Sequence, residues 1–176
     1  MQLLQTKLLA KSALVATLTT VLLAIGSMIR YFDLGFNVIA GMILWCFVLE
    51  YGRKYGALVY AATSILGLIL FPYKFTAFCY LMVFGLYSLA KPSLEKIRSS
   101  MLRWIVKLAI VNTCVVSLFY LYILLFMTNY FANSIAFAIM ILSCNIAFVV
   151  YDRLLVRVVD VYERRVRSVL SRVKLL

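Results

Sequence analysis

The sequence predicts an all-α fold, a polytopic membrane bundle of six transmembrane helices followed by an amphipathic cytoplasmic helix. Of the 176 residues, 66% are hydrophobic and 14% are charged. A soluble domain has about 45–50% apolar and about 25% charged residues. The chain has too little polar surface for a water-soluble globule, so lipid must be the solvent for much of it. We expect residues 1–152 to form the transmembrane domain and residues 153–176 a basic tail helix.

Charged residues divide the chain into six apolar segments. These are residues 12–29, 34–49, 55–71, 75–90, about 108–127 and about 131–151. None shows the alternation of polar and apolar residues that is typical of a barrel strand. The second and fourth segments have 16 residues each, roughly 24 Å of helix against a hydrocarbon core of about 30 Å. Either flanking cations extend these two spans by snorkelling, or one of them is a re-entrant or broken helix.

The positions of lysine and arginine predict the direction of the spans. With the N-terminus in the cytoplasm, 16 of the 18 cations lie inside and only Arg30 and Lys74 lie outside. This asymmetry is typical of the positive-inside rule. We therefore expect a multi-pass protein of a bacterial cell membrane, with both termini in the cytoplasm. Because the cations flank spans, their partner is membrane lipid, and nucleic-acid binding is not expected.

The residues for catalysis or metal binding are missing from the sequence. It contains no histidine and no G-x-x-x-x-G-K-[ST] loop. Its cysteines each lie inside an apolar run, where they behave as small apolar residues: Cys46, Cys79, Cys114 and Cys144. Charged residues fall at span ends rather than near span centres, which gives little support to ion pumping. We expect no enzyme activity, no metal and no cofactor.

Polar and aromatic residues gather in the outer loops and adjoining helix ends. A few polar groups with aromatic walls are typical of a small-molecule pocket, and the alternative is an ordinary interfacial belt of tyrosines and helix caps. Lys74 either pairs with an anionic substrate group or with Asp33, or simply marks a turn. The predicted substrate-binding residues are Arg30, Tyr31, Asp33, Asn37, Tyr73, Lys74, Thr76, Tyr80, Asn129 and Asn133.

The first segment carries a face of small residues at helical spacing. Small residues let two helix backbones approach closely within lipid. The face serves either internal packing or docking onto a partner membrane protein. The candidate docking residues are Ser12, Ala13, Ala16, Thr17 and Thr20.

Three further polar features lie toward the inner side. Asn112 and Asn145 fall in antiparallel neighbouring segments, where we expect an interhelical hydrogen bond. Residues 91–107 are expected to form a basic inner loop. In the tail 153–176, charged and apolar residues recur at spacings of three and four, which predicts an amphipathic helix. This helix lies on the anionic inner leaflet or pairs with a partner helix.

Two stretches, KLLAKSALVATLTTVLLA and EYGRKYGALVYAATSILGLILFPYK, resemble the substrate-binding S components of energy-coupling factor (ECF) transporters. The resemblance covers the architecture of essentially the whole chain. It implies capture of a vitamin-like solute between outer loops. It also implies a transmembrane coupling subunit, which docks on the first helix, and ATPase subunits that supply the energy.

A second class of function remains open. The basic loop 91–107 and the basic tail are also typical of a non-transporting membrane scaffold or assembly protein, similar to MreD, that recruits cytoplasmic partners. A channel is a distant third reading, because the sequence has no filter-like loop and no ring of like charges.

Overall fold

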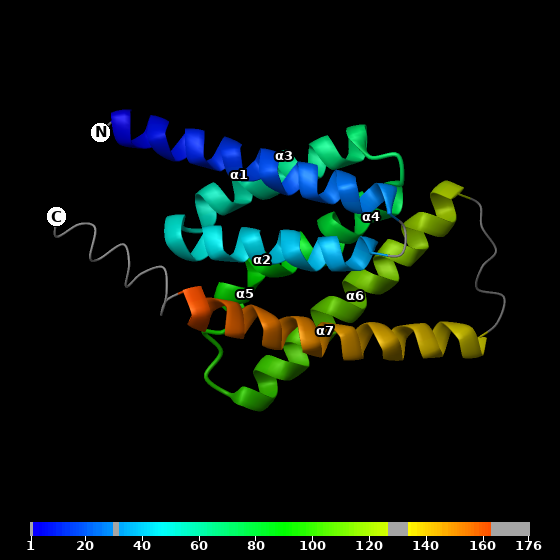
Figure 1. Cartoon of the computed structure of the whole chain (residues 1–176). Coiled ribbons are helices and arrows are strands. Elements are labelled where there is room, and N and C mark those ends of the chain that lie inside the picture. Colours follow the sequence, from blue (N-terminus) through cyan, green and yellow to red (C-terminus); the bar gives the residue numbers. More distant parts are fainter. Residues whose placement is uncertain (1, 30–31, 127–133, 163–176) are drawn as a thin grey trace.

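The computed structural model describes residues 2–29, 32–126 and 134–162. These residues form helices and connecting turns, and no strand occurs among them. The elements are α1 (Gln2–Met28), α2 (Asp33–Tyr51), α3 (Arg53–Leu70), α4 (Lys74–Cys79), the π-helical turn η1 (Tyr80–Phe84), α5 (Gly85–Leu94), α6 (Ser100–Phe126) and α7 (Ser134–Tyr162) (Figure 1). The all-α prediction is therefore confirmed for the described part of the chain.

Within the described residues, four helices are long and apolar enough to cross a membrane. They cover Gln5–Met28, Asp33–Tyr51, Lys74–Leu94 and Ser100–Leu121. The third combines α4, η1 and α5, which follow one another without a break. Helix α3 has only 18 residues and begins with Arg53 and Lys54. Many large apolar side chains lie exposed on the outside of the helices, including those of Leu14, Ile69 and Leu142. Such a surface is stable in lipid rather than in water.

Two turns between helices form at residues whose backbone preferences favour them, Gly52 and Phe71. Gly52 joins α2 to α3 with a φ of 87°, a conformation that side chains with a Cβ rarely adopt. Phe71, which precedes Pro72, is extended and ends α3, as expected for a residue before proline. These two turns explain why the second and third segments ended close to where the sequence predicted.

The predicted inner loop is mostly helix. Residues 91–107 were expected to connect two spans, but α5 continues to Leu94 and α6 begins at Ser100. Pro92 removes one backbone hydrogen bond from the last turn of α5. The burial of Lys91 and Leu94 in the bundle keeps that turn helical. The connection is therefore only residues 95–99, and Lys91 and Lys107 are helix residues rather than loop residues.

The last two helices are also longer than their predicted segments. Helices α6 and α7 have 27 and 29 residues, roughly 40 Å or more each. Helix α6 crosses α7 obliquely, whereas α1 and α2 run nearly along a common direction (Figure 1). Helix α7 passes through Asp152 without a break and extends to Tyr162. The predicted boundary at residue 152 thus lies inside a helix, and tail residues 163–176 lie outside the described residues.

Helix α2 lies at the centre and contributes to both hydrophobic clusters. The first cluster joins α1, α2, α3 and α4 around Leu23, Leu44 and Val59. The second joins α2 and α5 to α6 and α7 around Trp45 and Phe148. Because α6 and α7 belong only to the second cluster, they form a separate pair packed on one side of the bundle.

Candidate functional site

Three of the residues predicted to bind substrate converge at the beginning of α2. Asp33, Asn37 and Thr76 are at most 4% exposed. The amide of Asn37 donates to the Asp33 carboxylate at 3.1 Å and to the Asp33 carbonyl at 3.0 Å. The Thr76 hydroxyl lies against the same carboxylate, although neither its oxygen nor Asn37 Oδ1 makes a hydrogen bond of regular geometry among the described residues. The group is buried inside the bundle rather than facing an open mouth.

The remaining predicted outer residues lie in several places. Tyr80 is buried and packs against Tyr60, with their rings 6.1 Å apart. Tyr73 is half-buried and its ring lies 5.9 Å from that of Phe75. The predictions that fall outside the described residues are Arg30, Tyr31, Asn129 and Asn133.

Lys74 closes a turn instead of pairing with Asp33. Its ammonium group donates to the carbonyls of Leu68 and Ile69, at 2.8 and 3.3 Å. These carbonyls belong to the last turn of α3, where backbone acceptors lack intrahelical partners. Lys74 therefore caps α3 from the start of the next helix. Of the three roles open to it from the sequence, the structure gives it the one at the turn.

The small-residue face of α1 is divided between the inside and the outside of the bundle. Ser12, Ala16 and Thr20 are buried, whereas Ala13 and Thr17 are exposed. Helix α1 packs on α2 and α3, so the buried residues serve internal packing. Only Ala13 and Thr17 of the predicted docking set remain accessible to another protein.

A cavity of about 410 Å³ separates the α6–α7 pair from α2 and the α4–η1 segment. Its walls are apolar and rich in aromatic rings, and they include Phe75, Phe84, Phe119 and Phe148. Small-molecule sites are typically about 300–1,000 Å³ and mostly apolar. Of the predicted substrate-binding residues that the structure describes, none lines this cavity: Leu34 and Val38 face it, whereas their neighbours Asp33 and Asn37 are buried on another face of α2.

Tyr151 forms part of the cavity lining where the cavity meets a polar network. Its ring lies edge-on to Phe84, with centroids 5.1 Å apart. Its hydroxyl is 3.1 Å from Ser88 Oγ, which in turn lies 3.0 Å from the Gly41 carbonyl. The single Ser88 proton serves carbonyl acceptors, so the Tyr151 hydroxyl donates to Ser88. A Cβ at residue 41 would collide with this hydroxyl, which explains the glycine there.

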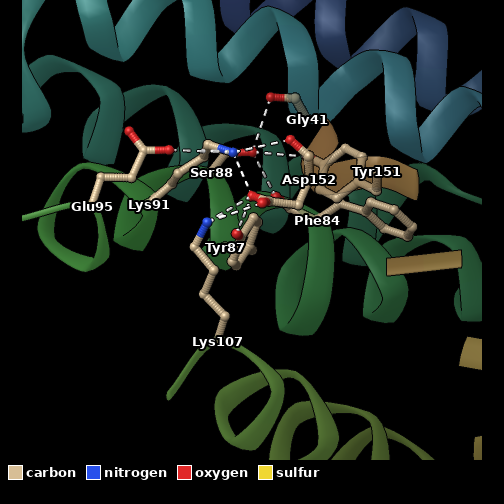
Figure 2. Close-up of polar contacts among 9 residues, drawn as sticks. All are labelled: Gly41, Phe84, Tyr87, Ser88, Lys91, Glu95, Lys107, Tyr151 and Asp152. Carbon is tan, nitrogen blue, oxygen red and sulfur yellow. Dashed lines mark hydrogen bonds and ion pairs between the residues drawn. The ribbon is translucent and has the colours of Figure 1, made fainter. Parts of the chain in front are cut away.

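Behind Tyr151 lies a buried ionic cluster, defined by Lys91, Lys107 and Asp152 and shown in Figure 2. The three residues are 0%, 4% and 3% exposed. The Asp152 carboxylate accepts from Lys91 at 2.5 Å and from Lys107 at 3.0 and 3.1 Å. It also accepts from the hydroxyl of Tyr87 at 2.5 Å. One carboxylate thus joins α5, α6 and α7.

The charges of this cluster are balanced. Lys91 also forms an ion pair with Glu95 at 3.5 Å, so two lysines face two carboxylates. The ammonium groups of Lys91 and Lys107 lie 5.6 and 5.4 Å from the rings of Trp45 and Trp104, which adds cation–π attraction. Buried charges are tolerated only when they are paired and hydrogen-bonded in this way. Together with Glu95, the cluster is therefore electrically neutral, and it lies between the cavity and the α5–α6 turn.

Sequence reasoning missed the ionic cluster because its three members looked like flanking charges. Each lies next to the predicted end of an apolar segment, where cations usually contact lipid headgroups. A usable signal was present in Asp152, an acid that follows 44 residues without a charge (108–151) and so needs a partner on another helix. The predicted bond between Asn112 and Asn145 is confirmed, with each amide donating to the other at 3.1 and 2.9 Å.

Among the described residues, no group of histidine, cysteine and acidic side chains could hold a metal ion. The chain matches no protein-family model, and neither the curated proteins nor the solved structures contain a match to it.

Proposed function

We propose that this chain is a membrane-embedded capture subunit of an ECF-type uptake transporter. It would bind a small solute and rely on partner subunits for ATP-driven uptake. The observation that carries the proposal is the cavity of about 410 Å³ between α2, α4–η1 and the α6–α7 pair. A bundle that had only to scaffold other proteins would gain stability by filling such a space.

The helix arrangement supports a six-span topology. Helices α1, α2 and α3, the continuous Lys74–Leu94 helix, α6 and α7 would be the six spans. Among the described connections, α2–α3 and α5–α6 lie at one end of the bundle and α3–α4 lies at the other (Figure 1). The cations at Arg53, Lys54 and Lys96 then lie at the cytoplasmic end together with both termini.

In this orientation, the cavity begins near the outer ends of its helices. Leu34 and Phe75 lie in the first turns of their helices, and Phe119 lies in the last third of α6. The ionic cluster of Lys91, Lys107 and Asp152 then lies on the inner side. A solute held in the cavity would contact Tyr151 on the outer side of the ionic cluster, which is the arrangement a captor needs before its partners act.

The exposed residues Ala13 and Thr17 offer a small-residue contact for a transmembrane coupling subunit. Two of the five predicted docking residues would thus contact the partner, whereas Ser12, Ala16 and Thr20 pack inside the bundle.

Ligand-dependent stabilisation tests the capture proposal. A ligand that binds only the folded state raises stability in proportion to the logarithm of its concentration over Kd. Purified protein in nanodiscs is heated with polar and apolar vitamins, nucleobases and metal salts, alongside Val115→Trp, which fills the cavity. We expect one solute to raise the midpoint of unfolding of the wild type but not of Val115→Trp. Equal responses across the whole panel would contradict capture in this cavity.

The scaffold alternative makes a different prediction. Removal of residues 163–176 leaves α7 intact to Tyr162, so the bundle keeps buried Leu155 and Asp152. If cytoplasmic partners are then lost from a pull-down while no solute stabilises the full chain, the scaffold function replaces the capture function.

A further inference from the structure

The substrate class can be inferred from the cavity lining. We infer that the cavity accepts an uncharged, largely apolar molecule with a planar or chain-like body, and excludes charged and strongly polar solutes. This inference rests on the proposed capture function and narrows its substrate.

In the part of the chain that the structure describes, no charged side chain lines the cavity. Among the described lining residues, the polar atoms of side chains are only the thiols of Cys79 and Cys144 and the hydroxyl of Tyr151. That hydroxyl is already bonded to Ser88. A solute bearing several hydroxyl, amide or phosphate groups would lose the hydration of each group without replacement, which disfavours its binding.

The nearby charges cannot serve as counter-ions. Lys91 and Lys107 lie behind Tyr151 and Phe84 and are bound to Asp152. Withdrawing a lysine toward an anionic substrate would leave the Asp152 carboxylate short of one partner in a buried site. The cluster therefore gives an incoming anion or cation no attraction to offset the loss of its hydration.

The shape of the lining favours flat or extended apolar bodies. Five aromatic rings surround the space: those of Phe75, Phe84, Phe119, Phe148 and Tyr151. Aromatic walls stack on planar ligands and bury large apolar areas.

The cavity opens toward the side of the bundle. The lining residues Leu34, Gly35 and Ala147 are exposed, and they belong to α2 and α7, which contact one another. In a protein surrounded by lipid, this opening faces the apolar phase into which an uncharged apolar solute partitions. The route of entry and the lining thus select the same class of molecule.

A pair of anthracene probes tests the inference in nanodiscs. 1-Aminoanthracene is uncharged at neutral pH and its fluorescence rises in apolar sites, whereas anthracene-1-carboxylate has the same rings and a charge. Val115 lines the cavity and is 6% exposed, whereas Val116 does not line it and is 45% exposed. The probe also dissolves in the lipid of the nanodisc, and this fluorescence is the same for both variants. The difference in fluorescence between Val115→Trp and Val116→Trp therefore reports binding in the cavity alone.

We expect 1-aminoanthracene to bind the wild type and Val116→Trp, and binding to be lost in Val115→Trp. Anthracene-1-carboxylate should bind none of them. Ala147→Trp, whose side chain starts at the exposed rim, is a second blocking variant if Val115→Trp does not fold. Its control is Ile146→Trp, since Ile146 is exposed and does not line the cavity.

The other outcomes separate the two proposals. If the carboxylate or a polar vitamin binds in a manner blocked by Val115→Trp or Ala147→Trp while 1-aminoanthracene does not, the substrate class is overturned and capture stands. If no probe or solute distinguishes the blocking variants from their controls, both proposals are overturned.

Thiol protection gives an independent readout. Cys79 and Cys144 line the cavity, whereas Cys114 on α6 does not. A bound apolar probe should slow modification of Cys144 by methyl methanethiosulfonate and leave Cys114 unaffected, as measured by mass spectrometry of the peptides that contain each cysteine. Equal protection of both thiols would show that the probe acts through the bilayer and would overturn the inference.

Discussion

The Asp152 carboxylate receives hydrogen bonds from three side chains, Tyr87, Lys91 and Lys107, on two other helices. It joins the α6–α7 pair to the rest of the bundle behind Tyr151, the residue at the inner end of the cavity. The ammonium groups of Lys91 and Lys107 both lie within 3.1 Å of it. Removal of the Asp152 charge would leave two buried lysines with Glu95 as their one acidic partner among the described residues.

Substitution of Asp152 by asparagine should therefore be strongly destabilising. Breaking a buried ion pair by removing one partner costs about 3–5 kcal/mol. The measurement is the unfolding midpoint of purified protein in the same nanodiscs, followed by tryptophan fluorescence from Trp45 and Trp104.

Glu95→Gln is the matched control for the Asp152 variant. The Glu95 side chain is 39% exposed, and a pair of this kind contributes at most about 1 kcal/mol. If Asp152→Asn unfolds no more easily than Glu95→Gln, the ionic cluster does not hold the helices together.

The sequence allowed only some of these residues to be assigned. Asn112 and Asn145 were predicted to bond because amides inside apolar segments have few other partners. Lys91, Lys107 and Asp152 were instead expected to lie at the ends of spans, because composition alone does not show where a helix ends. Their pairing depends on the crossing of α6 over α7, which no local pattern specifies.

At the scale of elements, the connection that depends most on one residue is the turn between α2 and α3. Gly52 has a φ of 87° and joins the two helices directly. Both helices were predicted to within two residues, because Glu50, Arg53 and Lys54 mark the boundary in the sequence. Apolar runs and charges thus predicted this hairpin well, whereas the π-helical turn η1 left no comparable signal.

Gly52→Ala should destabilise the protein by about 1 kcal/mol, since a Cβ is strained at this positive φ. Gly35 is the control, because it is a helical glycine with open space where a Cβ would go. Gly35→Ala should be neutral or slightly stabilising through its better helix propensity. Equal unfolding midpoints of the two variants in thermal denaturation would show that the turn is not strained.

At the scale of the whole molecule, the account depends on six spans with both termini inside. The charge asymmetry, the continuous Lys74–Leu94 helix and the alternating connections all support that topology. The cavity, in contrast, was not predictable from the sequence. Its walls come from five separate elements, and apolar residues facing an open space have the same periodicity as residues that pack.

The topology predicts opposite labelling of two exposed positions. In a variant without the native cysteines, Pro72→Cys in the α3–α4 turn should react with a membrane-impermeant maleimide in intact cells. Lys96→Cys in the α5–α6 turn should react only after the membrane is opened. Labelling of both positions from the same side would rule out the proposed topology.

The central claim is that the cavity holds a solute in the native membrane. Native mass spectrometry of protein released from that membrane tests it most directly. We predict one small molecule bound per chain in the wild type and in Val116→Trp, and none in Val115→Trp. An identical set of bound molecules in all three proteins, or no bound molecule in any of them, would contradict the account.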